Sequence, residues 1–134
     1  MRYKFFLTVL SVGIAAPLVA AAQFVPTLET DPHEVCPDRP AQPDWIENID
    51  VREAHFGNLV QMMYRAQGLQ AVSESEECTC ETRFPSWDAA QKYYYVHYAD
   101  LDRWEVLEMI AEYRQIARDH RQIAKPICEE QGNW

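Results

Sequence analysis

The sequence predicts an all-α protein, a small three-helix bundle with a four-helix bundle as the alternative. A proline-rich extended N-terminal arm precedes the bundle, and two disulfides staple it. Apolar residues recur at steps of three and four in three stretches, and no stretch alternates in the manner of a strand. Four cysteines follow an N-terminal segment typical of export. We expect three domains or segments, 1–22, 23–49 and 50–134.

Residues 1–22 have the three-part pattern of a secretory signal peptide. Arg2 and Lys4 form a basic start, an uncharged apolar core follows, and three alanines precede Gln23. The apolar core is shorter than the roughly 20 residues that span a bilayer. We therefore expect cleavage before Gln23 and no stable membrane insertion afterwards, with an uncleaved anchor as the alternative. The short basic start and alanine-rich cleavage site favour a periplasmic protein, with eukaryotic secretion as the alternative.

The mature chain is strongly acidic. The full chain has 12 basic and 21 acidic residues and a net charge of −9, and the leader contains two of the basic residues. Removing the leader therefore leaves a net charge of −11. Such a surface repels phosphate, so we expect no nucleic acid partner and no binding to anionic lipid. It permits a basic protein partner.

Residues 23–49 are predicted to form the extended arm. Prolines interrupt this segment and no apolar period runs through it. The five prolines are Pro26, Pro32, Pro37, Pro40 and Pro43. Trp45, Ile46 and Ile49 are expected to dock the end of the arm into the core.

The first helix is predicted over residues 50–67. Asp50 and Glu53 are spaced as a capping box, and Gly68 stands where a C-terminal glycine belongs. Its apolar stripe consists of Phe56, Leu59, Val60, Met63 and Ala66.

A loop is predicted at residues 72–82, because serines and acidic residues dominate there. The second helix is predicted over 87–98, with Ser86 as its N-cap. Trp87, Ala90, Tyr94 and Tyr98 recur along it at helical steps. A bend near Ala99, or an unbroken continuation, leads into the third helix.

The longest helix is predicted from Asp102 to Pro126, and the rest of the chain is expected to cover its apolar face. Asp102 and Glu105 are spaced as a capping box, and Pro126 is expected to end the helix. The apolar face consists of Val106, Met109, Ile110, Tyr113, Ile116, Ala117, Ile123 and Ala124.

The four cysteines predict two disulfides, since their number is even in an exported chain. A Cys78–Cys80 bridge would close a strained ring. The other two connectivities each join one member of this pair to Cys36 and the other to Cys128. Both remain open at this stage. Either would contribute about 3–4 kcal/mol per bridge in the chain-entropy model.

The Cys78-Thr79-Cys80 motif also carries the alternative functional hypothesis. Two thiols one residue apart are used in disulfide exchange and in binding of soft metals. Glutamates surround the pair and disfavour the thiolate form, which favours structural disulfides. The alternative is therefore a thiol-redox or metal-handling protein.

An aromatic run on the second helix supplies the candidate interface. Five of the six residues from 93 to 98 are aromatic or histidine, and consecutive helix positions point around the whole circumference. One neighbour cannot bury them all. The candidate interface residues are Tyr93, Tyr95, His97 and Trp104, whose rings suit protein contacts.

The leading functional hypothesis is an exported, non-enzymatic interaction protein. It would be an accessory or inhibitor-like subunit of an envelope assembly such as a secretion or conjugation apparatus. The chain has only four glycines and no phosphate-binding or nucleophile motif, so we expect no cofactor, no metal site and no catalytic residue. A hydrolase of wall polymers is a further alternative, with Glu105 and Glu108 as its best candidates.

Overall fold

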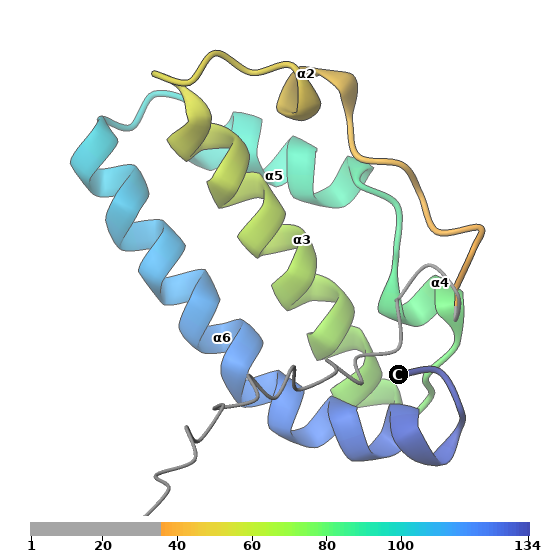
Figure 1. The fold of residues 1–134 in the computed structure, drawn as a ribbon. Coiled ribbons are helices and arrows are strands. Elements are labelled where there is room, and N and C mark those ends of the chain that lie inside the picture. The colour runs from red at the N-terminus through yellow and green to blue at the C-terminus, as the bar shows by residue number, and fades with distance from the viewer. Residues whose placement is uncertain (1–35) are drawn as a thin grey trace, which may run out of the picture.

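The computed structural model describes residues 36–134 and shows a small all-helical domain, as predicted (Figure 1). Its three substantial helices are α3, α5 and α6, and short helices α2 and α4 lie in the connections. Their bounds are α2 Asp44–Glu47, α3 Ala54–Ser75, α4 Cys80–Arg83, α5 Asp88–His97 and α6 Arg103–Glu130. The predicted signal peptide and residues 23–35 of the predicted arm lie outside the described residues. The predicted domain boundaries stay predictions.

Helix α3 is the central element of the described chain. It contacts α6 along most of its length, and it also contacts α4 and α5. Figure 1 shows α3 and α6 side by side, with α5 crossing the N-terminal half of α3. The C-terminus lies beside α4, close to the end of α3. The long predicted helix is therefore present, but α3 rather than α6 has packed neighbours on several sides.

The buried side chains form two clusters at opposite ends of this α3–α6 pair. We call the first the aromatic end, because partly buried tryptophan, tyrosine and phenylalanine rings pack around its buried core. Its buried members are Ile46, Leu59, Val60, Met63, Ala90, Tyr94, Val106 and Ile110. We call the second the disulfide end. Its buried members are Ala66, Leu69, Val72, Cys78, Ala117, Ala124 and Cys128.

The predicted capping box at the start of α6 is confirmed. Asp102 Oδ1 accepts hydrogen bonds from the backbone N–H groups of Trp104 at 2.7 Å and Glu105 at 3.0 Å. Glu105 Oε2 in turn accepts from the Asp102 N–H at 2.8 Å. Four residues with free N–H groups begin any helix, and this reciprocal pair satisfies three of these donors in one turn. The chain therefore breaks between α5 and α6 and starts a new helix.

The prediction that Pro126 ends the long helix is wrong. Helix α6 continues to Glu130 with Pro126 inside it. Proline removes one hydrogen bond and crowds the carbonyl four residues earlier, which bends a helix without always ending it. Figure 1 shows α6 curving in this C-terminal part. Ala124 and Cys128 are fully buried on either side of the proline, and the packing of these two residues holds the last turns in place.

The predicted end of the first helix is also wrong. Helix α3 runs past Gly68 to Ser75, so its last turn occupies part of the predicted loop. The hydroxyls of Ser73 and Ser75 bond back to helix carbonyls, which satisfies polar side chains within the helix. The residue in the left-handed conformation that ends α3 is Glu76, with φ 58°.

Gly68 serves close packing rather than helix termination. A Cβ atom at this position would lie 2.3 Å from the carbonyl oxygen of Arg83. The backbone that follows α4 therefore lies directly against α3, at a distance that only glycine allows.

The start of α3 and the start of α5 depart from the predicted caps in different ways. The predicted Asp50–Glu53 capping box is absent, because Asp50 Oδ1 accepts from the Arg52 N–H at 2.8 Å in the turn before the helix. Glu53 occupies the N-cap position without a side-chain hydrogen bond. Ser86 does bond to the start of α5, where its Oγ accepts from the Asp88 N–H at 3.2 Å.

The described part of the arm, residues 36–49, docks as predicted and contains the unpredicted short helix α2. Ile46 is buried, and the Trp45 indole N–H donates to Gln91 Oε1 on α5 at 2.8 Å. Gln61 on α3 donates to Gln42 Oε1 at 3.0 Å. These bonds lay the end of the arm across α3 and α5.

Two disulfides are present, and they select one of the two open connectivities. Cys36 is bonded to Cys80, and Cys78 is bonded to Cys128, with sequence separations of 44 and 50. The adjacent pair in the central loop thus ties the arm to α4 and the end of α6 to the loop that follows α3. Two such bonds are consistent with an oxidising compartment.

Candidate functional site

The four predicted interface residues all lie at the surface, but they do not form one patch. The exposed fractions are 45% for Tyr93, 58% for Tyr95 and 73% for Trp104, and His97 is also exposed. The rings of Tyr93 and His97 lie 4.1 Å apart on one side of α5. Tyr95 faces Trp45 of α2 instead, with ring centroids 6.0 Å apart. No ring contact joins Trp104 to another described residue. That these residues bind a partner stays a prediction.

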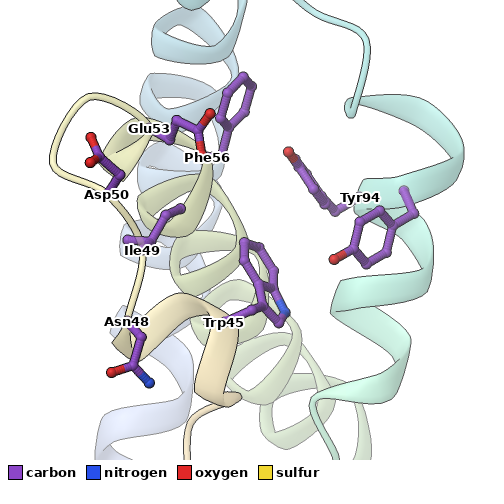
Figure 2. A pocket seen from close by; sticks show the side chains of 8 residues that line it. Trp45, Asn48, Ile49, Asp50, Glu53, Phe56 and Tyr94 are labelled. Carbon is purple, nitrogen blue, oxygen red and sulfur yellow. The ribbon is translucent and has the colours of Figure 1, made fainter.

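A pocket at the aromatic end brings Tyr95 together with its neighbour Tyr94 and with two rings from other helices (Figure 2). Trp45 comes from α2, Phe56 from α3, and Tyr94 and Tyr95 from α5. Trp45 stacks on Tyr94 with centroids 6.0 Å apart, and Phe56 meets Tyr94 edge-on at 6.2 Å. The pocket has a volume of about 410 Å³. The hydrogen bond from the Trp45 indole N–H to Gln91 fixes the orientation of the Trp45 ring in this pocket.

The charged groups of this pocket are both carboxylates, from Asp50 and Glu53. Neither forms an ion pair with another residue in the described part of the chain. Burial, then Tyr95, then the charge of Glu53 raise the pKa of Tyr94 above the usual value for tyrosine. Aromatic faces and unpaired carboxylates both attract cations. We call this site the acidic aromatic pocket, and its chemistry suits a cationic group.

A second pocket lies at the disulfide end and has the opposite charge. Among the described residues that line it, four are arginines and none is acidic. It has a volume of about 360 Å³ and combines residues from α3, α6, the chain around α4 and the C-terminus. We call it the arginine pocket. Its lining is Arg39, Tyr64, Arg65, Leu69, Arg83, Phe84, Arg121 and Trp134.

The arginines of this pocket lie over aromatic rings. The guanidinium groups of Arg83 and Arg121 are each 4.5 Å from the centre of the Trp134 ring. Arg83 also lies 5.0 Å from the Phe84 ring centre and donates a hydrogen bond to the Asn133 carbonyl oxygen. Such stacking fixes the plane of a guanidinium while leaving its edge free to donate hydrogen bonds.

The electrostatic environment of Arg83 is set by burial and like charge. Burial lowers its pKa below the usual range, and the neighbouring charges of Arg121 and Arg39 lower it further. Arg65, Arg83 and Arg121 form no ion pair with a described residue. These three guanidinium groups therefore gather positive charge that no acidic side chain of residues 36–134 pairs with.

The sequence contains a signal for part of the arginine pocket that the apolar pattern of the long helix does not reveal. Arg114, Arg118 and Arg121 follow one another at steps of four and three, so they lie on one side of α6. In the structure these three line a small groove of about 80 Å³ together with Arg65. Because Arg65 and Arg121 line both hollows, the groove continues the arginine pocket. The contribution of Arg83 and Trp134 depends on tertiary packing and has no sequence signal.

Three of the four sequence candidates for catalysis and redox chemistry have structural partners, and the fourth, Glu108, lies at the surface. Glu105 is held in the capping box of α6, and Glu108 is exposed on the helix surface. Cys78 and Cys80 are in separate disulfides. Within residues 36–134, no group of three or more histidine, cysteine or acidic side chains is placed to hold a metal ion.

No protein family, curated protein or solved structure matches this chain. None of the helices in the described region combines the length and the apolar character needed to cross a bilayer.

Proposed function

We propose that the chain is an exported, periplasmic, non-enzymatic interaction protein. It acts as an accessory or inhibitor-like subunit of an envelope assembly such as a secretion or conjugation apparatus. Its partner is a basic protein that inserts a lysine or arginine side chain into the acidic aromatic pocket. The single observation that carries this proposal is the combination of four aromatic rings with two unpaired carboxylates in that pocket.

The chemistry of the pocket supports a basic side chain over an apolar one. A cation over an aromatic face is stabilised by about 0.5–2 kcal/mol, and a nearby carboxylate adds Coulomb attraction. The pocket is held by three separate helices, so it is formed before a partner arrives (Figure 2). A net charge of −9 for the whole chain adds long-range attraction for a basic partner.

Export is supported by the signal-peptide pattern of residues 1–22 and by the two disulfides. N-terminal sequencing of protein from the cell envelope is expected to start near Gln23. A mass that retains residues 1–22 would identify a membrane anchor instead.

No observation favours the thiol-redox or metal-handling alternative. Both cysteines of the motif are bonded to partners more than 40 residues away, with separations of 44 and 50. A redox motif would use Cys78 and Cys80 as free or mutually bonded thiols.

The pocket can be tested with a short lysine-rich peptide as the probe. Binding is followed by the NMR signal of the Trp45 indole N–H in uniformly ¹⁵N-labelled protein. We expect Glu53→Gln to weaken binding about three- to tenfold, because the substitution removes one of two carboxylates without removing a helix cap. Tyr95→Ala is expected to weaken it as well.

Glu108→Gln is the matched control, since it removes the same charge from an exposed position on α6. It is expected to change the affinity less than twofold, a general charge effect. Equal effects of the two substitutions would show that the peptide reads net charge and not the pocket, and would contradict the proposal. A photo-crosslinker at position 95 in cells, compared with one at exposed Ala89, then identifies the partner.

A further inference from the structure

We propose that the arginine pocket is a binding site for an organic anion, in which a carboxylate or phosphate group is attached to an apolar or aromatic body. This inference is independent of the proposed function, because the pocket lies at the other end of the α3–α6 pair and has the opposite charge. Its basis is the juxtaposition of Arg65, Arg83 and Arg121, none of which forms an ion pair with a described residue, with an apolar wall.

The basic residues of the chain are concentrated around the arginine pocket. The chain has 12 basic residues in total, of which two are in the predicted leader. Six of the other ten line the arginine pocket or its adjoining groove. They are Arg39, Arg65, Arg83, Arg114, Arg118 and Arg121. In a chain whose net charge is negative, a random surface would intersperse these with acidic residues, and no acidic residue of the described chain lines either hollow.

Two guanidinium donors of the pocket are held in place by an aromatic ring. The guanidinium groups of Arg83 and Arg121 are each 4.5 Å from the centre of the Trp134 ring. The ring orders two long side chains that would otherwise lose rotamer freedom on binding. An ordered guanidinium presents parallel N–H groups that match the two oxygens of a carboxylate or phosphate.

The arginine pocket also has an apolar wall. Tyr64, Leu69, Phe84 and Trp134 line the same hollow, and its volume of about 360 Å³ exceeds that of a bare oxyanion. Binding sites for small molecules combine such walls with a few converging polar groups. The ligand therefore carries an apolar or aromatic body beside its anionic group.

Structural contacts account for only some of the arginines that line the pocket and its groove. Arg83 is tied to the C-terminal segment through the Asn133 carbonyl. Arg65 is exposed and forms no hydrogen bond or ion pair with another described residue. On α6, Arg114 and Arg118 are four residues apart, a spacing at which like charges destabilise a helix. An arrangement that costs stability in the free protein is explained by a ligand that neutralises it.

The test uses the full mature protein with both disulfides intact. The probes are phenyl phosphate and benzoate, with benzyl alcohol as the neutral analogue and inorganic phosphate as the bare ion. Titrations are followed by the NMR signals of the Trp134 indole N–H and the arginine Nε–H groups. We expect saturable shifts with the two aromatic anions, none with benzyl alcohol, and weaker binding of inorganic phosphate. The preferred aromatic anion identifies the head group as carboxylate or phosphate.

The double variant Arg65→Gln/Arg121→Gln is expected to weaken binding of the preferred anion about tenfold or more, because two charge-assisted contacts are lost. The control Arg52→Gln/Arg103→Gln removes the same charge from exposed positions outside the pocket and is expected to change the affinity less than twofold. The Arg65→Gln/Arg121→Gln variant is expected to bind the lysine-rich peptide at the acidic aromatic pocket as the wild type does. This separates failure of the present inference from failure of the proposed function.

Three results would overturn the inference. The first is equal loss of binding in the two double variants, which would mean that the anions respond to net charge. The second is binding of inorganic phosphate as tight as that of the aromatic anions, which would mean that the apolar wall has no role. The third is binding that occurs only after Glu29, Asp31 and Glu34 are neutralised by amide substitution, which would assign the pocket to the chain's own acidic segment.

Discussion

The two ends of the α3–α6 pair are stabilised by different kinds of interaction. At the aromatic end, large side chains fill the space between helices, and no covalent bond crosses it. At the disulfide end, three of the buried residues are alanines, and both covalent bonds are found there. Alanine buries little area, so packing at that end yields less stabilisation per residue. One end of the α3–α6 pair is therefore stabilised by packing, whereas at the other end disulfides tie the arm, the loop after α3 and the end of α6 together.

Charge follows the same division. The acidic aromatic pocket lies at the packed end and the arginine pocket at the cross-linked end. Repulsion among arginines weakens the helices and loops that carry them. A small alanine-rich core offsets little of that repulsion, whereas a disulfide keeps the loops in place regardless of charge. We infer that the cross-links allow Arg65, Arg83 and Arg121 to lie together at this end without an ion pair to a described residue.

Ile110→Asp is expected to have the largest effect, because it places an unpaired carboxylate in the core of the packed end. Ile110 is 3% exposed, and the expected cost of more than about 4 kcal/mol exceeds what a small domain tolerates. The domain is expected to lose cooperative unfolding in circular dichroism. Leu107→Asp is the control, since Leu107 is on the same helix but 38% exposed. If Ile110→Asp melted like the wild type, the assignment of the core face of α6 would be wrong.

Removal of the disulfides tests the other end. In the chain-entropy model, each of the two bonds contributes about 4 kcal/mol or less, because both close long loops. Cys78→Ser/Cys128→Ser is expected to lower the melting temperature strongly and to release the end of α6. Amide hydrogen exchange is expected to accelerate in residues 117–130 and to change little in residues 103–113. Uniform acceleration along α6 would show that the two ends unfold as one unit.

Sequence reasoning predicted the features that depend on local pattern or on composition. The apolar stripe of α3, the Asp102 capping box and the role of the four cysteines are of this kind. It was wrong where a residue that usually ends a helix instead takes part in tertiary packing. Gly68 and Pro126 both resemble helix ends, yet Gly68 makes room for the Arg83 carbonyl and Pro126 is accommodated in a helix held by Cys128.

The candidate sites were less predictable than the fold for the same reason. Tyr95 was identified from its place in an aromatic run, but its partners Trp45 and Phe56 are 50 and 39 positions away in the chain. Their meeting depends on how α2, α3 and α5 cross. The arginine pocket needs the C-terminal Trp134 to reach Arg83 and Arg121, and no periodicity in the sequence encodes that contact.

Two glycine substitutions in α3, one at each end, are expected to differ in stability by an intermediate amount. Gly57→Ala, at the packed end, adds a methyl group that meets side-chain methyls of Ile46 and Ile49 at 3.3 and 3.5 Å. The gain in helix propensity of about 1 kcal/mol offsets this crowding, so we expect a change near zero. Gly68→Ala, at the cross-linked end, meets a backbone oxygen at 2.3 Å. Overpacking there is expected to cost about 1–3 kcal/mol, and thermal unfolding of the two variants measures the difference. Equal stability would mean that the α4 backbone moves away easily and that the cross-linked end is not tightly packed.

The smallest expected effect is the one that bears most directly on the arginine pocket. Arg65→Gln removes a charge that has no described ion-pair partner and that lies near other arginines. Relief of repulsion is expected to leave the free energy of unfolding unchanged or to raise it by up to about 0.5 kcal/mol at low salt. The gain is expected to shrink near 1 M salt, where the screening length falls to about 3 Å. Lys125→Gln, on α6, removes a charge paired with Glu129 at 3.5 Å and is expected to lower stability slightly. Opposite signs for the two variants mean that the arginines are held against their own repulsion, as a site for an anion requires. A loss above about 1 kcal/mol for Arg65→Gln would instead make the arginines stabilising elements of the cross-linked end, and the cluster would then need no ligand to explain it.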